Sequence, residues 1–111
     1  MENNNKMKIP HKFKVGGQDV KVEFTNTIVG DKLGECVLWN GKIRISEIYR
    51  GEPQTDDSQF NTFYHELTHA ILDTMGEYEL SANEKFVCSF SGFLSEAIRN
   101  FEFNNEWLWN L

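Results

Sequence analysis

The feature of the sequence that most restricts its fold is a run of apolar residues, three or four positions apart, between residues 60 and 76. The members of this stripe are Phe60, Phe63, Tyr64, Leu67, Ile71 and Met75. Such spacing puts the side chains on one face of an α-helix, so it predicts a helix that packs against a core. Asp56, Asp57 or Ser58 can cap the start of this helix. Gly76 can end it, because glycine readily adopts the left-handed conformation that follows many helices.

Two stretches upstream alternate between apolar and polar residues, as half-buried strands do. In "KFKVGGQDVKVEFT", the alternation is interrupted by Gly16-Gly17, which predicts a hairpin. In "ECVLWNGKIRIS", Asn40-Gly41 is the pair that a two-residue type I′ turn prefers, so a second hairpin is predicted. The strand residues expected to flank this turn are Val37, Trp39, Ile43 and Ile45.

A second helix is predicted to begin at Ser81. Its apolar stripe consists of Val87, Phe90, Leu94, Ala97, Ile98 and Phe101. Two hairpins followed by two helices indicate an α+β fold, with a small antiparallel-rich sheet and two packed helices.

The length of 111 residues suits a single domain. We expect residues 8–103 to form it, residues 1–7 to be a loose polar tail and residues 104–111 to be an aromatic tail. In the second tail, Trp107 and Trp109 would either fold back on the domain or form a patch for a partner or for self-association.

Charge and composition exclude several classes of protein. The net charge of −6 argues against nucleic-acid binding, which usually requires a basic patch. No apolar run approaches the roughly 18–20 residues of a membrane helix, and "MENNNKMKIPHKFK" lacks the apolar stretch of a secretion signal. Cys36 and Cys88 fit reduced thiols better than a disulfide framework. We therefore expect a cytoplasmic protein that binds neither nucleic acid nor a membrane.

The first predicted helix contains "FYHELTHAIL", in which His65 and His69 are four residues apart. On a helix they share one face, so both imidazoles can hold the same zinc ion. Glu66 lies at the edge of that face, where a carboxylate can take a proton from a zinc-bound water. This is the His-Glu-x-x-His pattern of zinc hydrolases, and it predicts one Zn²⁺ per chain. The alternative is a pair of solvated histidines on the polar side of the helix.

A catalytic zinc ion needs a third protein ligand, and no histidine follows the motif. Among the later carboxylates Glu77, Glu79 and Glu84, the last is favoured because it starts the second helix and can point back at the first. Ser81 and Glu84 also match a capping box, which would occupy the same carboxylate. Cys36 is the other candidate ligand.

Together, "FYHELTHAIL" and "SANEKFVCSF" resemble small zincin metallopeptidases of the gluzincin kind, including minigluzincins and the short His-Glu-x-x-His proteins of phages and prophages. The resemblance covers about residues 33–98 and extends more loosely to ImmA/IrrE metallopeptidase domains. It implies a zincin-like fold in which His65, His69 and Glu84 bind zinc and Glu66 is the general base. Unlike larger relatives, the chain has no obvious helix before the sheet.

The resemblance also implies the reaction. Glu66 would activate a zinc-bound water to hydrolyse a peptide bond in a peptide or protein substrate, which would pair with a sheet edge. The strand of residues 42–46 is the candidate edge, and Tyr78 or His11 is the candidate partner of the oxyanion. One alternative is a zinc-bearing regulatory or binding protein of the same fold with little turnover. Another is a zinc hydrolase of a non-peptide bond, such as a deformylase with a cysteine ligand.

Overall fold

A computed structural model describes residues 9–104 of the chain, so the predictions for residues 1–7 and for Trp107 and Trp109 lie outside the described residues. The elements of the described part are β1 (Lys12–Val15), β2 (Gln18–Thr25), β3 (Gly34–Val37), a 3₁₀ turn η1 (Leu38–Asn40), β4 (Lys42–Ser46), β5 (Ile48–Tyr49), β6 (Glu52–Pro53), α2 (Asp56–Met75), α3 (Tyr78–Ser81) and α4 (Glu84–Arg99). None of the helices in this part has the length and apolar character needed to cross a membrane.

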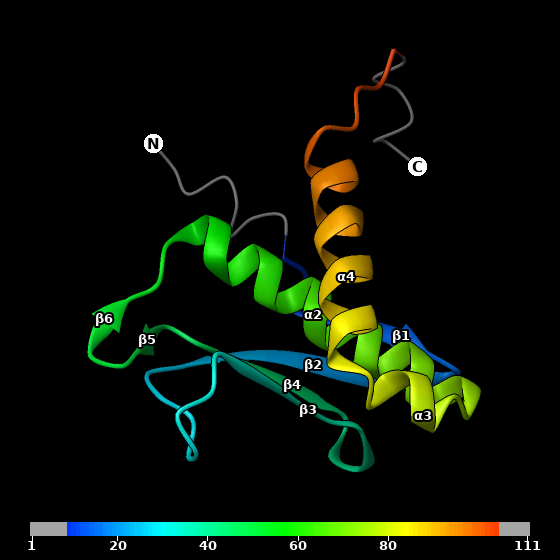
Figure 1. The fold of residues 1–111 in the computed structure, drawn as a ribbon, viewed down its shortest axis with the longest axis horizontal. Coiled ribbons are helices and arrows are strands. Elements are labelled where there is room, and N and C mark those ends of the chain that lie inside the picture. The colour runs from blue at the N-terminus through cyan, green and yellow to red at the C-terminus, as the bar shows by residue number, and fades with distance from the viewer. Residues whose placement is uncertain (1–8, 105–111) are drawn as a thin grey trace.

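The predicted α+β fold class is confirmed. Antiparallel pairs β1–β2 and β3–β4 form the two predicted hairpins, and β5 pairs with β6 in a separate small sheet. The hairpins join through a parallel pairing of β2 with β4, so the four-stranded sheet is mixed and has the order β1-β2-β4-β3. In Figure 1, α2 lies over this sheet, while α4 crosses α2 and rises away from the strands.

The core lies between the sheet and the first half of α2. Its buried apolar members are Ile9, Val20, Val22, Ile43, Ile45, Phe60, Phe63 and Tyr64. The predicted stripe is wrong at its end, since Ile71 and Met75 are 39% and 64% exposed. At this end of the helix Ala70 is buried instead, and Thr74, one turn further on, lies against the turn at Gly16. An α-helix has 3.6 residues per turn, so Ile71 and Met75 are rotated away from the face that carries Ala70 and Thr74.

The caps of α2 differ from the prediction at one end. Thr55 is the N-cap, because its hydroxyl accepts a hydrogen bond from the Ser58 backbone N–H at 3.0 Å. Asp56 and Asp57 instead occupy the first turn, where negative charge suits the helix dipole. Gly76 ends the helix at φ 82°, as predicted.

The turn of the second hairpin is not of type I′. Residues 38–40 form η1, and Gly41 follows in the left-handed region at φ 64°. The register pairs Val37 with Lys42, so four residues rather than two connect the strands. Trp39 therefore lies in the turn and is 87% exposed, whereas it was expected in a strand.

The second helix begins later than predicted. Ser81 ends the short helix α3, and α4 starts at Glu84. The N-cap of α4 is Asn83, whose side-chain oxygen accepts a hydrogen bond from the Phe86 N–H at 3.1 Å. The predicted capping box is therefore wrong. Asparagine caps helices as well as serine does, and its use leaves the Glu84 carboxylate available for another role.

The apolar stripe expected on α4 is only partly buried. Val87, Ser91 and Ser95 are the buried residues of this helix, whereas Phe90 and Phe101 are 47% and 58% exposed. Ser95 donates a hydrogen bond to the Asn61 side chain of α2 at 2.8 Å. Small residues therefore let α4 pack closely on α2, beside the predicted site.

Candidate metal centre

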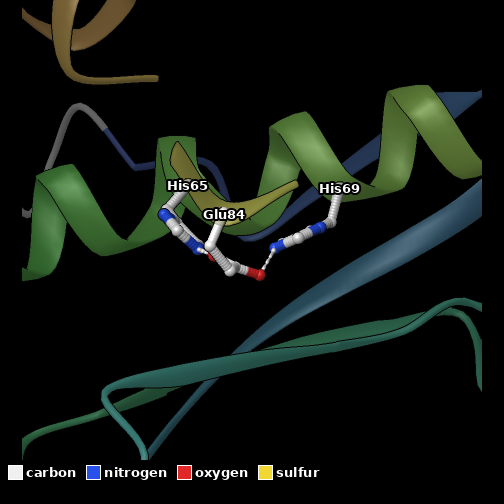
Figure 2. A group of neighbouring side chains, drawn as sticks. All are labelled: His65, His69 and Glu84. Carbon is white, nitrogen blue, oxygen red and sulfur yellow. Dashed lines mark ion pairs between the residues drawn. The ribbon is translucent and has the colours of Figure 1, made fainter. Parts of the chain in front are cut away.

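The structure brings the three predicted metal ligands together. His65 and His69 lie one turn apart on α2, and Glu84, the first residue of α4, lies across from both (Figure 2). The Nε2 atom of His65 is 3.3 Å from one carboxylate oxygen of Glu84, and the Nε2 atom of His69 is 3.4 Å from the other. A reversal of the chain through α3 makes this approach possible.

These distances match the requirements of a metal site. One donor atom from each of the three residues can be chosen so that all lie within 4.8 Å of one another. A tetrahedral site with bonds of about 2.0–2.1 Å has edges of about 3.3–3.4 Å. Each imidazole nitrogen lies at this distance from a Glu84 oxygen, and the two nitrogens face different oxygens of the carboxylate. The Glu84 side chain is 63% exposed, so the group opens toward solvent. His65, His69 and Glu84 could therefore hold a metal ion and leave a position for another ligand.

The surroundings of both histidines suit metal binding. The Nδ1 atom of His69 lies 3.0 Å from the hydroxyl of Ser81, a buried residue. When this nitrogen donates its hydrogen to the hydroxyl, the lone pair of Nε2 faces Glu84. Burial, followed by the nearby His69, lowers the pKa of His65, so its imidazole is neutral at pH 7. The Cys88 sulfur lies 3.9 Å from the Nδ1 atom of His65, on the far side of that ring.

Ser81→Ala is expected to weaken zinc binding by about 10–100-fold, because outer contacts fix the orientation and tautomer of metal-binding histidines. The sequence suggested that Ser81 caps a helix, whereas in the structure its hydroxyl contacts His69. The matched control is Asn83→Ala, which removes the actual cap of α4 but no contact to a histidine. Zinc dissociation constants from competition with a chromogenic chelator provide the measurement. Equal constants for Ser81→Ala and the wild type would contradict the role of this hydroxyl.

Glu66 lies beside the metal group and is only 7% exposed. Burial, reinforced by the charges of Glu84 and Glu35, raises its pKa to about 7. Strand β3 passes directly over it: a Cβ atom on Gly34 would lie 3.2 Å from the Glu66 Cγ atom and 2.5 Å from the Thr62 Cγ2 atom. The close approach of β3 to α2 therefore requires glycine at position 34, and it shields Glu66 from water.

Two neighbouring cavities reach the centre. The larger, of 1010 Å³, runs between α2, α4 and the segment before β3, and its lining includes His65 and Glu66. The smaller, of 410 Å³, lies over the metal group and is bordered by β3.

The sheet order makes β3 an edge strand, whereas β4 lies between β2 and β3. The prediction that residues 42–46 form the edge is therefore wrong.

The other candidate ligands lie outside the group. Cys36 lines the smaller cavity but is not among the three residues whose donor atoms converge within the described chain. Burial raises the pKa of its thiol to about 12, so the thiol stays protonated at neutral pH. Glu77 and Glu79, also considered from the sequence, are exposed and do not belong to the group.

The sequence-derived candidates for the oxyanion partner are not near the centre. His11 precedes β1, at the opposite edge of the sheet from β3, and it lines neither cavity. Tyr78 begins α3, is 68% exposed and also lines neither cavity. Sequence reasoning missed the contact from Ser81 to His69. The spacing of these two residues carries no motif, because α3 brings them together.

Comparisons of the chain with protein-family models, with curated proteins and with solved structures gave no match. The residues of the centre and their geometry are therefore the basis for a functional assignment.

Proposed function

We propose that the protein is a zinc-dependent peptidase. The observation that carries this proposal is the buried Glu66 carboxyl beside two imidazoles and a carboxylate that converge at the mouth of a cleft. Two imidazole nitrogens and one carboxylate form a donor set that suits zinc and leaves a fourth position open. A bound zinc ion would lower the pKa of a water molecule and draw electrons from a substrate carbonyl.

Glu66 would transfer protons between the water and the substrate. A carboxylate beside the metal group can accept a proton from the water and release it again. Glu66 removes a proton as the water oxygen bonds to the carbonyl carbon. It returns this proton to the amide nitrogen when the carbon–nitrogen bond breaks. The products are a carboxylic acid, which then ionises, and an amine.

The edge strand β3 is the proposed docking site for the substrate. As an edge strand, it has one side of its backbone free of the sheet, and it borders the cavity over the metal group. An extended peptide can add to such an edge through main-chain hydrogen bonds. A peptide placed along β3 would pass Glu66, and the larger cleft between α2 and α4 would receive its side chains. β3 therefore takes the docking role that was expected from the sequence for residues 42–46.

The two alternative functions fit the geometry of the centre less well. Deformylase-type hydrolases with a cysteine ligand would need Cys36 in the donor group, but Glu84 occupies the third position opposite both histidines. A zinc-bearing regulatory protein with little turnover would not need a buried carboxyl beside the metal group. The position of Glu66 therefore favours catalysis over binding alone.

The zinc-loaded protein is expected to cleave extended peptides, and removal of the metal is expected to abolish cleavage. The measurement is mass spectrometry of a mixed peptide library after incubation with zinc-loaded, chelated and zinc-restored protein. Glu66→Gln, purified in parallel, is the matched control for contaminating proteases, since it keeps the metal ligands. Cleavage by Glu66→Gln at the wild-type rate, or none by the zinc-loaded wild type, would contradict the proposal.

A further inference from the structure

The proposed reaction creates a negative charge that the residues described so far do not meet. When the water oxygen bonds to the carbonyl carbon, an electron pair of the carbonyl moves onto its oxygen. Enzymes usually place a hydrogen-bond donor or a cation at this oxygen, which lowers the free energy of the transition state. His11 and Tyr78 lie elsewhere, so neither of them can assist a zinc ion in stabilising this oxygen.

Lys32 is positioned next to the metal group. It lines both the larger cleft and the smaller cavity, and it is the one lysine or arginine among the described residues around the smaller cavity. The carboxylates that line the same small cavity are Glu35, Glu66, Asp73 and Glu84. Lys32 therefore supplies a full positive charge at an otherwise acidic site.

The segment that carries Lys32 is anchored on both sides. Before it, Asp31 donates its backbone N–H to the Ile28 carbonyl at 3.1 Å and forms an ion pair of 3.1 Å with Arg50. After it, the Leu33 carbonyl accepts a hydrogen bond from the Ser46 N–H of β4 at 2.9 Å. The backbone on both sides of Lys32 is thus held in place, beside the two cavities that the exposed Lys32 side chain lines.

The ammonium group of Lys32 is available to an incoming anion. Within residues 9–104, no carboxylate forms an ion pair with it at 4.0 Å or less. Glu35, on the nearby strand β3, is held instead by Arg44 at 3.0 Å. Asp31, the preceding residue, is held by Arg50. The nearest acidic neighbours along the chain therefore have other partners. The charge of Lys32 acts on Glu66 across the cavity and lowers the pKa of that carboxyl, but the two form no ion pair of 4.0 Å or less in the described part of the chain.

We propose that Lys32 is a catalytic residue that stabilises the negative charge on the carbonyl oxygen of the substrate. This inference rests on the proposed peptidase function. The ammonium does not transfer a proton: it meets the oxygen while the electron pair resides there, and it loses this contact when the carbon–nitrogen bond breaks. Glu66 remains the group that carries the proton from the water to the leaving nitrogen.

The test compares Lys32→Met with Lys32→Arg and with Lys21→Met. Lys21 is an exposed lysine of β2 that lines neither cavity, so Lys21→Met is the matched control for loss of one positive charge. For zinc-loaded Lys32→Met we expect kcat to fall by about 100-fold, with KM changed less than about threefold and zinc content unchanged. Lys32→Arg should recover part of kcat, because it keeps the charge.

A binding measurement gives a readout that does not depend on turnover. The probe is a phosphinic analogue of tetraalanine, in which a tetrahedral anionic phosphorus group replaces the central peptide carbonyl. Its dissociation constant for the cobalt-loaded protein can be followed by visible absorption. We expect Lys32→Met to weaken binding by at least about 10-fold, since transition-state analogues respond to groups that stabilise the transition state. Lys21→Met should bind like the wild type.

The outcomes separate this inference from the proposed function. If the wild type cleaves peptides while Lys32→Met keeps its kcat and its affinity for the phosphinate, the inference is overturned and the peptidase assignment stands. If only KM rises, Lys32 binds the substrate elsewhere, and the inference is also overturned. If the wild type cleaves nothing, the peptidase assignment fails. The phosphinate affinity of Lys32→Met then decides whether Lys32 stabilises an anion at the centre.

Discussion

Glu84→Ala is expected to lose zinc under mild chelation, whereas Asp73→Ala is expected to keep it. Both carboxylates line the small cavity, but only Glu84 lies 3.3–3.4 Å from the two imidazole nitrogens. Removal of one of three protein ligands leaves a two-histidine site, half of the tetrahedron. The loss of affinity should therefore exceed the roughly 10–100-fold expected for an outer contact such as that of Ser81. Competition with a chromogenic chelator measures the difference.

Cys36→Ser separates the two candidate third ligands in the same assay. Its thiol lines the cavity but lies outside the group of converging donors, and it stays protonated at neutral pH because burial raises its pKa to about 12. We expect the Cys36→Ser protein to bind zinc as the wild type does. If Cys36→Ser lost zinc while Glu84→Ala kept it, the centre would be of the cysteine-ligand type, and the peptidase proposal would lose its main support.

Glu66→Gln is expected to stabilise the metal-free protein at pH 8, although it removes the proposed general base. The folded-state pKa of Glu66 is about 7, against an ordinary value of 4.5, because burial disfavours its charged form. A carboxyl with a raised pKa contributes its full stability below pH 4.5 and loses it as the pH rises through 7. At about 1.4 kcal/mol per pKa unit, the penalty above pH 7 approaches about 3 kcal/mol. Glutamine has no charge to bury.

Denaturant unfolding of the metal-free proteins at pH 5 and pH 8 measures this effect. The free energy of unfolding of Glu66→Gln should exceed that of the wild type by a margin that grows between the two pH values. Glu79→Gln, at an exposed carboxylate of α3, is the control and should show no such growth. A margin that is constant with pH would mean that the Glu66 carboxyl ionises normally. The zinc content of Glu66→Gln should equal that of the wild type, because the three ligands are untouched.

Much of the candidate site could be predicted because its signals are local. His65 and His69 follow one another on a helix, and the apolar residues around them fix which face the helix buries. Gly76 was correctly predicted to end this helix, since a glycine after an amphipathic stretch is a strong stop signal. The placement of Glu84 opposite the histidines agreed with the expectation that the second helix points its first turn at the first helix.

The remaining features depend on contacts that no local pattern encodes. The parallel pairing of β2 with β4 joins strands from two separate hairpins, and it decides that β3 is the edge. Ser81 and Asn83 are both good caps, so sequence alone favoured the wrong one. Lys32 has no recognisable spacing from His65 or Glu66, since the sheet and α2 meet only through tertiary packing. Such residues become visible only when the fold places them at one cavity.

The short helix α3 determines how the centre would acquire its ion. In an unfolded chain, an ion held by His69 and Glu84 would have to close a loop of about 15 residues, which opposes binding by roughly 3 kcal/mol of chain entropy. In the folded chain, Gly76 and α3 have already reversed the backbone, and the Ser81 hydroxyl already holds His69. Folding therefore assembles the ligands before the ion arrives. Uptake and exchange of the metal would then proceed at the open cavity without rearrangement of the backbone. The bound ion would stabilise the native state, because it would bind the folded chain more tightly than the unfolded chain.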